Sequence, residues 1–111
     1  MSYQHKTLAE NKWNKMSFLE QMANIGSEVE RTILWNTKKN DDYSKKAFYR
    51  SLELFDLSLG APLKLSKRRE VARARELWVD FVMYGNSYKS TSDQWRKYFY
   101  QLLYAFKNMK E

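Results

Sequence analysis

The chain has 111 residues, 43% of them hydrophobic and 16% aromatic, which fits one ordinary domain and excludes wholesale disorder. It contains no cysteine, which excludes a disulfide framework and agrees with a cytoplasmic location, and no apolar run long enough for a signal peptide or a membrane span. The formal net charge of +7 indicates a surface that attracts polyanions or an acidic partner, although positive charge can also simply maintain solubility.

Residues 1–16 are mostly polar and are predicted to form an N-terminal arm, separate from the main domain of residues 17–111. A short helix can begin at residues 7–10, with Trp13 docking it. We expect the arm to be ordered only if Trp13 and Leu8 occupy a groove on the rest of the chain.

The first long helix is predicted over residues 17–38. Ser17 and Glu20 have the spacing of a capping box, in which each side chain binds a free backbone N–H. Its buried face recurs every three or four positions: Phe18, Met22, Ile25, Val29 and Ile33. Glycine is unfavourable within a helix, so Gly26 in this face predicts either the close approach of another backbone or a local bend.

The second helix is predicted over residues 42–59, with Asp41 or Asp42 as its N-cap. Its wide apolar face includes small residues, as in a helix that contacts two neighbours. That face consists of Tyr43, Ala47, Phe48, Ser51, Leu52, Leu54, Phe55, Ser58 and Leu59. Gly60 is expected to end the helix in a left-handed conformation.

The third helix is predicted over residues 63–84 and ends at Gly85 and Asn86. Its buried face is Val71, Ala74, Leu77, Trp78 and Phe81. Thr91 and Gln94 form a second capping-box pattern, from which a fourth helix runs to the end of the chain. Its main face is Trp95, Tyr98, Phe99, Leu102, Ala105, Phe106 and Met109.

Four helices of similar length joined by short loops predict an all-α fold, an antiparallel up-down-up-down four-helix bundle. Bundles that hold two metal ions need Glu-x-x-His pairs, but the sole histidine, His5, lies in the arm. No glycine-rich phosphate loop or activated serine is present, and the carboxylate pairs have basic neighbours or lie on outer helix faces. We therefore expect no enzyme, no metal site and no cofactor.

The positive charge is concentrated in the second half of the chain: residues 1–60 carry +1 and residues 61–111 carry +6. Four cations of the third helix fall within about 80° of one another. They are Lys64, Lys67, Arg68 and Arg75. Arg69 and Arg73 project to the opposite side, where Glu76 and Asp80 can neutralise them.

The four cations on one flank have two interpretations. Together with Arg96 and Lys97 they can form a track that binds nucleic-acid phosphates, with exposed tyrosines stacking on bases. Alternatively they pair with acidic residues of the first helix, such as Glu28 and Glu30.

Three residues of the fourth helix lie outside its main face: Tyr100, Leu103 and Tyr104. They make this helix apolar over most of its circumference, more than a monomeric bundle needs. We therefore expect a homo-oligomer whose interface includes them.

Residues 18–31, FLEQMANIGSEVER, followed by Trp35, resemble the opening of a family of small uncharacterised bacterial helical proteins. The similarity returns at residues 93–100, and Lys39 departs from it where a glycine is expected. The resemblance implies no catalytic residue. In architecture alone, the chain resembles the four-helix proteins encoded in ribosomal-RNA intervening sequences and the accessory proteins of diversity-generating retroelements. Both assemble as pentamers, and the second bind nucleic acid.

Two functions remain open at this stage. One is an oligomeric accessory subunit that binds RNA or DNA through the basic flank. The other is an interaction or structural module that meets an acidic protein and has no nucleic-acid role.

Overall fold

The structure, a computed structural model, describes residues 6–109. All regular structure in that part of the chain is helical, which confirms the all-α class. The helices are α1 (Lys6–Asn14), α2 (Phe18–Thr37), α3 (Asp41–Leu59), α4 (Leu65–Met83) and α5 (Ser92–Met109). No helix within these residues combines the length and apolar character that a membrane span requires.

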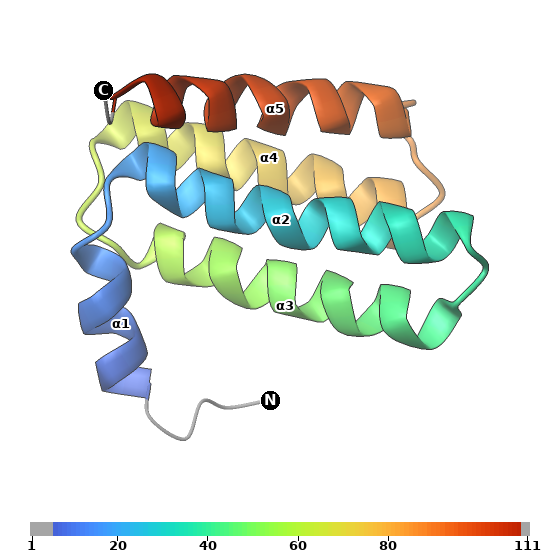
Figure 1. The fold of residues 1–111 in the computed structure, drawn as a ribbon, viewed down its shortest axis with the longest axis horizontal. Helices are drawn as coiled ribbons and strands as arrows, with labels where there is room; N and C mark the ends of the chain where they lie inside the picture. The colour runs from blue at the N-terminus through green and yellow to red at the C-terminus, as the bar shows by residue number, and fades with distance from the viewer. Residues whose placement is uncertain (1–5, 110–111) are drawn as a thin grey trace.

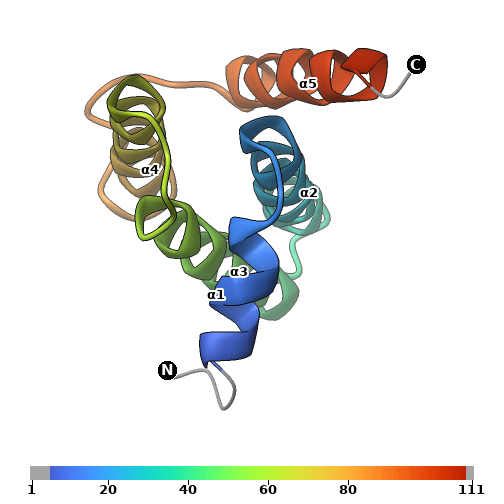
Figure 2. The same ribbon diagram turned by 90° about the vertical axis from the view of Figure 1, so that its left-hand side faces the viewer.

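The helices α2 to α5 run in alternating directions along the long axis of the molecule, and α1 packs against the end of α3 (Figure 1). α2 contacts both α3 and α5, and α3 also contacts α4. Figure 2 shows α5 crossing α2 obliquely, so that its C-terminal part projects beyond α2 on the side away from α4. Side chains connect α4 and α5: the Trp78 and Trp95 rings lie 5.3 Å apart, and Tyr98 donates a hydrogen bond to Glu70.

Local side-chain bonds explain where the helices begin. Ser17 accepts a hydrogen bond from the N–H of Glu20 at 3.1 Å. Thr91 and Gln94 bond reciprocally, side chain to backbone, at 3.0 and 3.2 Å, which confirms the second capping box. The predicted cap at Asp41 or Asp42 is wrong, because Asn40 accepts from the N–H of Tyr43 and leaves the two aspartates in the first turn.

The glycines have different roles. A Cβ at Gly26 would lie 3.0 Å from the Cβ of Phe99, so α5 does approach closely there, but the nearest atoms belong to a side chain and not to the predicted backbone. The prediction for Gly60 is wrong: its φ of −87° is right-handed. Left-handed backbone occurs instead at Gly85, with φ of 78°, and at the next residue.

The core lies between α2, α3, α4 and α5 and contains most of the predicted residues. Its buried hydrophobic members are Trp13, Met22, Ile25, Val29, Ile33, Ala47, Phe48, Phe55, Ala61, Val71, Ala74, Trp78, Trp95 and Phe99. Two predicted members are wrong: Tyr43 is 49% exposed and Met109 is 65% exposed. Tyr43 instead packs edge-on against Trp35 beside the turn between α2 and α3.

Trp13 docks the N-terminal helix, as the sequence predicts. Its indole N–H donates to Ser58 at 2.9 Å, and Ser58 donates to the Gln21 side-chain carbonyl at 2.8 Å. The Gln21 amide in turn donates to the Trp13 carbonyl at 3.1 Å. Because all three side chains are buried, this closed set of bonds fixes α1 on α2 and α3. The side chain of Leu8 lies outside the described part of the chain.

Candidate nucleic-acid interface

The basic flank predicted on α4 is largely engaged in structural contacts. The Arg68 guanidinium donates to the Ala61 carbonyl at 2.8 Å. Arg75 donates to the Asp56 carboxylate of α3 at 2.9 Å. These two cations therefore hold α4 and the preceding loop against α3 and do not form an open track.

The two lysines of the flank are less constrained. The Lys67 ammonium lies 4.9 Å from the centre of the Phe18 ring, a cation–π contact with α2. Lys64 immediately precedes α4, makes no side-chain cap and is exposed. The flank thus offers fewer free charges than its sequence spacing suggests.

The acidic partners differ from those predicted. Glu28 is buried and pairs with Arg31 and, at 2.9 Å, with Arg50 of α3. Glu30 pairs with Arg96. The alternative in which the α4 cations pair with these two glutamates is therefore wrong, because α3 and α5 lie beside α2 and supply nearer arginines.

On the other side of α4 one predicted pair forms and one does not. Arg73 lies 3.7 Å from Glu76. Asp80 does not neutralise an arginine; it is buried and accepts the N–H groups of Ser87 and Tyr88 at 3.0 and 3.1 Å. Burial acts to raise the pKa of Asp80, but these N–H groups lower it overall. Asp80 therefore anchors the loop between α4 and α5.

Arg96 and Lys97 are exposed residues in the N-terminal part of α5. Arg96 binds the Glu30 carboxylate through Nε and Nη2, each at 2.9 Å. These hydrogen bonds raise the pKa of Arg96 above its ordinary value. Lys97 is exposed and lies beside Glu30, Arg96 and Tyr100 at the surface.

A continuous stripe of basic and aromatic residues follows the outer face of α5. The α5 stripe consists of Lys97, Tyr100, Gln101, Tyr104 and Lys107, all of them exposed. Tyr100 is 68% exposed and Tyr104 is 60% exposed. Their spacing places the five side chains within about 120° of one another on a helix. Within Ser92–Met109 the only acidic residue is Asp93, so the stripe carries no negative charge.

Sequence reasoning missed Gln101 and Lys107 as members of this surface. It assigned Tyr100 and Tyr104 to an oligomer interface, and it joined Lys97 and unspecified exposed tyrosines to a track centred on α4. The available signal was the recurrence of lysine and tyrosine every three or four positions from 97 to 107, on the face opposite Trp95 and Phe99.

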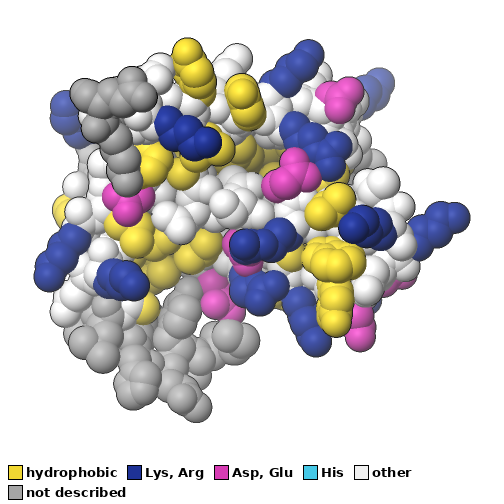
Figure 3. Space-filling view, in the orientation of Figure 1, with side chains coloured by type: hydrophobic (Ala, Val, Ile, Leu, Met, Phe, Trp, Pro, Cys, Tyr) yellow, Lys and Arg dark blue, Asp and Glu magenta, His cyan; other side chains and the backbone are white. Residues whose placement is uncertain are grey.

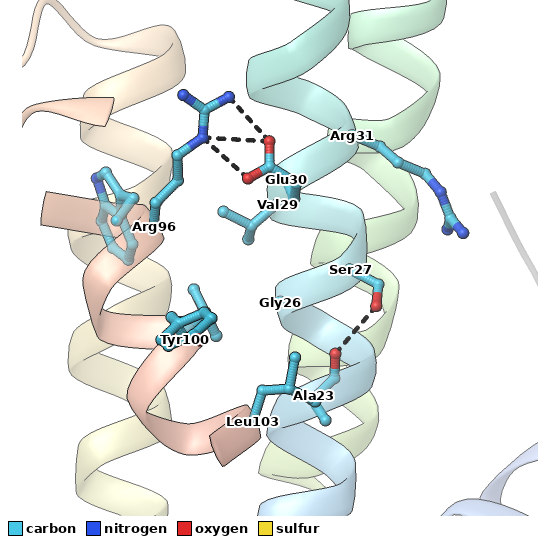
Figure 4. Close-up of a pocket in the computed structure, with 11 residues that line it drawn as sticks. Ala23, Gly26, Ser27, Val29, Glu30, Arg31, Arg96, Tyr100 and Leu103 are labelled. Atoms are coloured by element: carbon cyan, nitrogen blue, oxygen red, sulfur yellow. Dashed lines mark hydrogen bonds and ion pairs between the residues drawn. The ribbon is translucent and has the colours of Figure 1, made fainter. Parts of the chain in front are cut away.

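The side of α5 that faces α2 borders a groove. The α2–α5 groove has a cavity of about 340 Å³ and is lined mainly by apolar and small residues. On α2 they are Ala23, Gly26, Ser27, Val29, Glu30 and Arg31; on α5 they are Trp95, Arg96, Phe99, Tyr100 and Leu103. Figure 4 shows Tyr100 and Leu103 on one wall, the Arg96–Glu30 pair across one end, and Arg31 directed away. Figure 3 shows hydrophobic side chains projecting at the edge of the molecule that α5 forms.

A second hollow of about 310 Å³ lies between α4 and α5. Its apolar lining includes Leu77, Trp95 and Tyr98. Tyr98 donates to Glu70 at 2.8 Å, and burial, together with this bond, raises the pKa of Tyr98. The indole N–H of Trp95 is buried and is the only buried side-chain polar atom without a hydrogen-bond partner among the described residues.

The residues predicted for an oligomer interface divide between these surfaces. Tyr104 lies on the α5 stripe, Leu103 is half-buried in the wall of the groove, and Tyr100 is exposed on the stripe and also lines the groove. No cluster of three His, Cys, Asp or Glu side chains that could hold a metal occurs in residues 6–109. His5 lies outside that range.

Comparison of the chain with protein-family models, with curated proteins and with solved structures finds no match. The resemblance to small bacterial helical proteins therefore rests on the residues quoted for it above.

Proposed function

We propose that this protein is a non-enzymatic accessory protein of the cytoplasm that binds nucleic acid through the α5 stripe. In this proposal α2 to α5 form an antiparallel four-helix bundle that presents the stripe, and α1 is an arm docked on its side. The observation that carries the proposal is the pairing of exposed tyrosines with lysines on one helix face that has no acidic residue within Ser92–Met109.

Each residue type of the stripe has a role in such binding. Tyrosine rings stack on bases, which contributes about 1–3 kcal/mol per base, and lysines bind phosphates without reading sequence. Binding is thus expected to be sequence-tolerant, modest in affinity for one subunit and weakened by salt. Release of counterions from a single strand by two lysines gives a slope of roughly −1.4 in a plot of log K against log salt concentration.

The α5 stripe supports the proposal better than the α4 flank does. Arg68 and Arg75 have hydrogen-bond partners within the fold, and binding a phosphate would require them to leave those partners. Lys97 and Lys107 form no ion pair within the described residues, although Lys97 lies beside Glu30, which pairs with Arg96. Lys64 and Lys67 remain available as secondary contacts.

Self-association is the competing use of Tyr100 and Tyr104. If α5 helices of two copies paired antiparallel about a twofold axis near residue 102, Lys97 of one copy would lie near Lys107 of the other. Like charges placed together oppose association, whereas a polyanion neutralises both. The repulsion between lysines of two copies, which a polyanion does not meet, favours nucleic acid over a second copy as the ligand of the stripe.

The test is fluorescence anisotropy of a labelled single-stranded oligonucleotide of mixed sequence, titrated with protein at increasing salt. Lys97→Glu/Lys107→Glu should abolish binding at low salt. The control, Lys45→Glu/Lys46→Glu, makes the same charge change at exposed positions of α3 and should weaken binding much less. Light scattering of the same variants reports any change in oligomeric state.

Two results would overturn the proposal. One is the absence of binding by the wild-type protein at low salt. The other is an equal loss of binding in the α3 control, which would mean that only net charge matters. A dimer of the wild-type protein that Leu103→Glu/Tyr104→Glu converts to a folded monomer, without nucleic-acid binding, would assign this face to self-association.

A further inference from the structure

The α2–α5 groove has the shape of a narrow slot. Its α2 wall is low because Ala23, Gly26 and Ser27 project little beyond the backbone. Its α5 wall is higher and carries the Tyr100 ring and the Leu103 side chain (Figure 4). An apolar slot with an aromatic wall suits a flat ring, which gains from contact with both faces.

One end of the slot is polar and can recognise the edge of a heterocycle. The bonds from Arg96 to Glu30 use Nε and Nη2, and Figure 4 shows the remaining guanidinium nitrogen directed away from Glu30 and from the groove. The Glu30 carboxylate is about half exposed and has further capacity to accept. The Glu30 carboxylate, held in place by Arg96, therefore presents an acceptor at this end of the slot, which suits an amino group at the edge of a base.

The size of the slot indicates what can enter it. A helix from a second copy is about 10 Å across with its side chains. The α2 wall of the slot is low only along the helical turn from Ala23 to Ser27, and the Arg96–Glu30 pair crosses one end of the slot. A cavity of about 340 Å³ is at the lower limit of small-ligand sites, so it fits a small flat ligand rather than a helix.

The slot is continuous with the α5 stripe because Tyr100 belongs to both. A strand whose phosphates contact Lys97 and Lys107 would pass directly over the opening. Its unstacked bases could turn inward, whereas the bases of a duplex are stacked and paired, and removing one costs a few kcal/mol.

We propose that the α2–α5 groove receives one unstacked base of a single strand bound along the α5 stripe, which makes single-stranded nucleic acid the preferred ligand. This inference rests on the proposed function and adds a base site to it. The base contacts the Tyr100 ring and Leu103, and its edge faces the Arg96–Glu30 pair.

The experiment compares three ligands at one salt concentration: a single strand, the duplex of the same sequence, and the single strand with abasic sites throughout. Wild-type protein should bind the intact strand about tenfold more tightly than either of the other two, the scale of base stacking. Ser27→Leu fills the slot from α2 and should remove this preference while leaving the salt slope unchanged. Asn36→Leu, at an exposed position of α2 outside the groove, is the matched control.

A second filling variant, Ser27→Gln, adds a polar side chain of high helix propensity and keeps the test valid if the leucine variant fails to fold. Circular dichroism melting establishes folding of each variant. Equal affinity of wild-type protein for all three ligands would overturn the base site and the stacking role of the tyrosines, while leaving phosphate binding by the lysines of the stripe intact. Absence of binding to any of them would overturn both proposals, and a preference that survives in both Ser27 variants would overturn the groove as its location.

Discussion

Between α2 and α3 the buried polar atoms have hydrogen-bond partners, whereas between α4 and α5 the buried indole N–H of Trp95 has none in the described part of the chain. The α2–α3 side uses small side chains, Ser44 and Ser58, each of which also forms a hydrogen bond from α3 to α2. The α4–α5 side uses large rings, such as Trp78 and Trp95, whose centroids are 5.3 Å apart.

This difference shows how residue size governs both packing and function. Small residues let the α2 and α3 backbones approach closely, and the hollow of about 340 Å³ on that side lies where α1 meets these two helices. Rings keep the helices apart, and packing around them leaves a hollow between α4 and α5. Both proposed binding surfaces involve α5, the helix that packs obliquely and exposes tyrosines, while the α2–α3 side supplies the rigid support.

The largest expected difference in stability is between phenylalanine substitutions at the two tryptophans that meet between α4 and α5. Trp78 is fully buried and donates to Ser51 at 2.9 Å, so Trp78→Phe loses a hydrogen bond and leaves a cavity. We expect a loss of about 2–4 kcal/mol in the free energy of unfolding. Trp95→Phe also removes ring volume, but it removes an unpaired buried donor as well, so we expect a change of less than about 1 kcal/mol. Urea denaturation measures both, and equal losses would contradict the comparison.

Ser58→Ala tests the closed hydrogen-bond set on the α2–α3 side. Removing this hydroxyl leaves the Trp13 indole N–H and the Gln21 carbonyl buried without their partner. The expected cost is about 1–3 kcal/mol, with faster amide exchange in α1. Ser27→Ala, at an exposed serine of α2, should change stability by less than about 0.5 kcal/mol. A similar small effect at Ser58 would mean that the hydrogen bonds do not hold α1.

Gly26→Ala tests the contact between α2 and α5. Alanine gains about 1 kcal/mol of helix propensity, but its Cβ would lie 3.0 Å from the Phe99 Cβ, and such overpacking costs about 1–3 kcal/mol. We expect a net loss of about 1 kcal/mol. Gly60→Ala is the control, since its nearest neighbour would be at 3.6 Å and its φ is right-handed; it should be neutral or slightly stabilising. Stabilisation by Gly26→Ala, seen as a rise in melting temperature, would contradict the expected overpacking and would mean that α5 can shift to accommodate the added Cβ.

The Tyr98–Glu70 contact predicts a loss of stability at alkaline pH on the α4–α5 side. Burial raises the pKa of Tyr98 in the folded protein, so the unfolded chain loses this proton first as pH rises past the ordinary tyrosine value of about 10. Because the folded state then binds more protons, unfolding becomes more favourable as pH rises further. Tyr98→Phe should lose less stability between neutral and alkaline pH than wild type, measured by urea denaturation. Identical pH profiles would remove Tyr98 as the cause.

Helix positions were predictable from the sequence because caps and apolar spacing act locally. Ser17, Thr91 and the apolar faces place the helix boundaries within two residues of those observed, except for the short α1. The N-cap prediction failed because neighbouring residues, Asn40 and Asp41, could both serve as the cap. The prediction for Gly60 failed because its backbone conformation depends on the direction in which the chain leaves the helix. Lys39, at the position where the family resemblance leads one to expect glycine, has a φ of 60°.

The candidate site was less predictable because ion pairing depends on packing between helices. Arg75 meets Asp56, which is 19 positions away, and Arg96 meets Glu30, which is 66 positions away. Helical periodicity places a cation on a flank but does not state which neighbouring helix covers that flank. The α5 stripe required only local spacing, so the sequence contained enough information to find it.

The smallest expected effects come from ion pairs. They should differ between the exposed pair that joins α5 to α2 and the partly buried pair that joins α3 to α2. Arg96 and Glu30 are 41% and 49% exposed, so a double-mutant cycle with Arg96→Gln and Glu30→Gln should give a coupling of about 0.2–1 kcal/mol that falls with added salt. Glu28 is only 7% exposed in its pair with Arg50, so solvent screens that pair less, and the cycle with Glu28→Gln and Arg50→Gln should give a larger coupling that depends less on salt. Urea denaturation of all single and double variants at low and high salt measures both couplings. If the Arg96–Glu30 coupling were the larger, burial of Glu28 would not strengthen its pair with Arg50, and the assumed difference in solvent screening between the two pairs would be wrong.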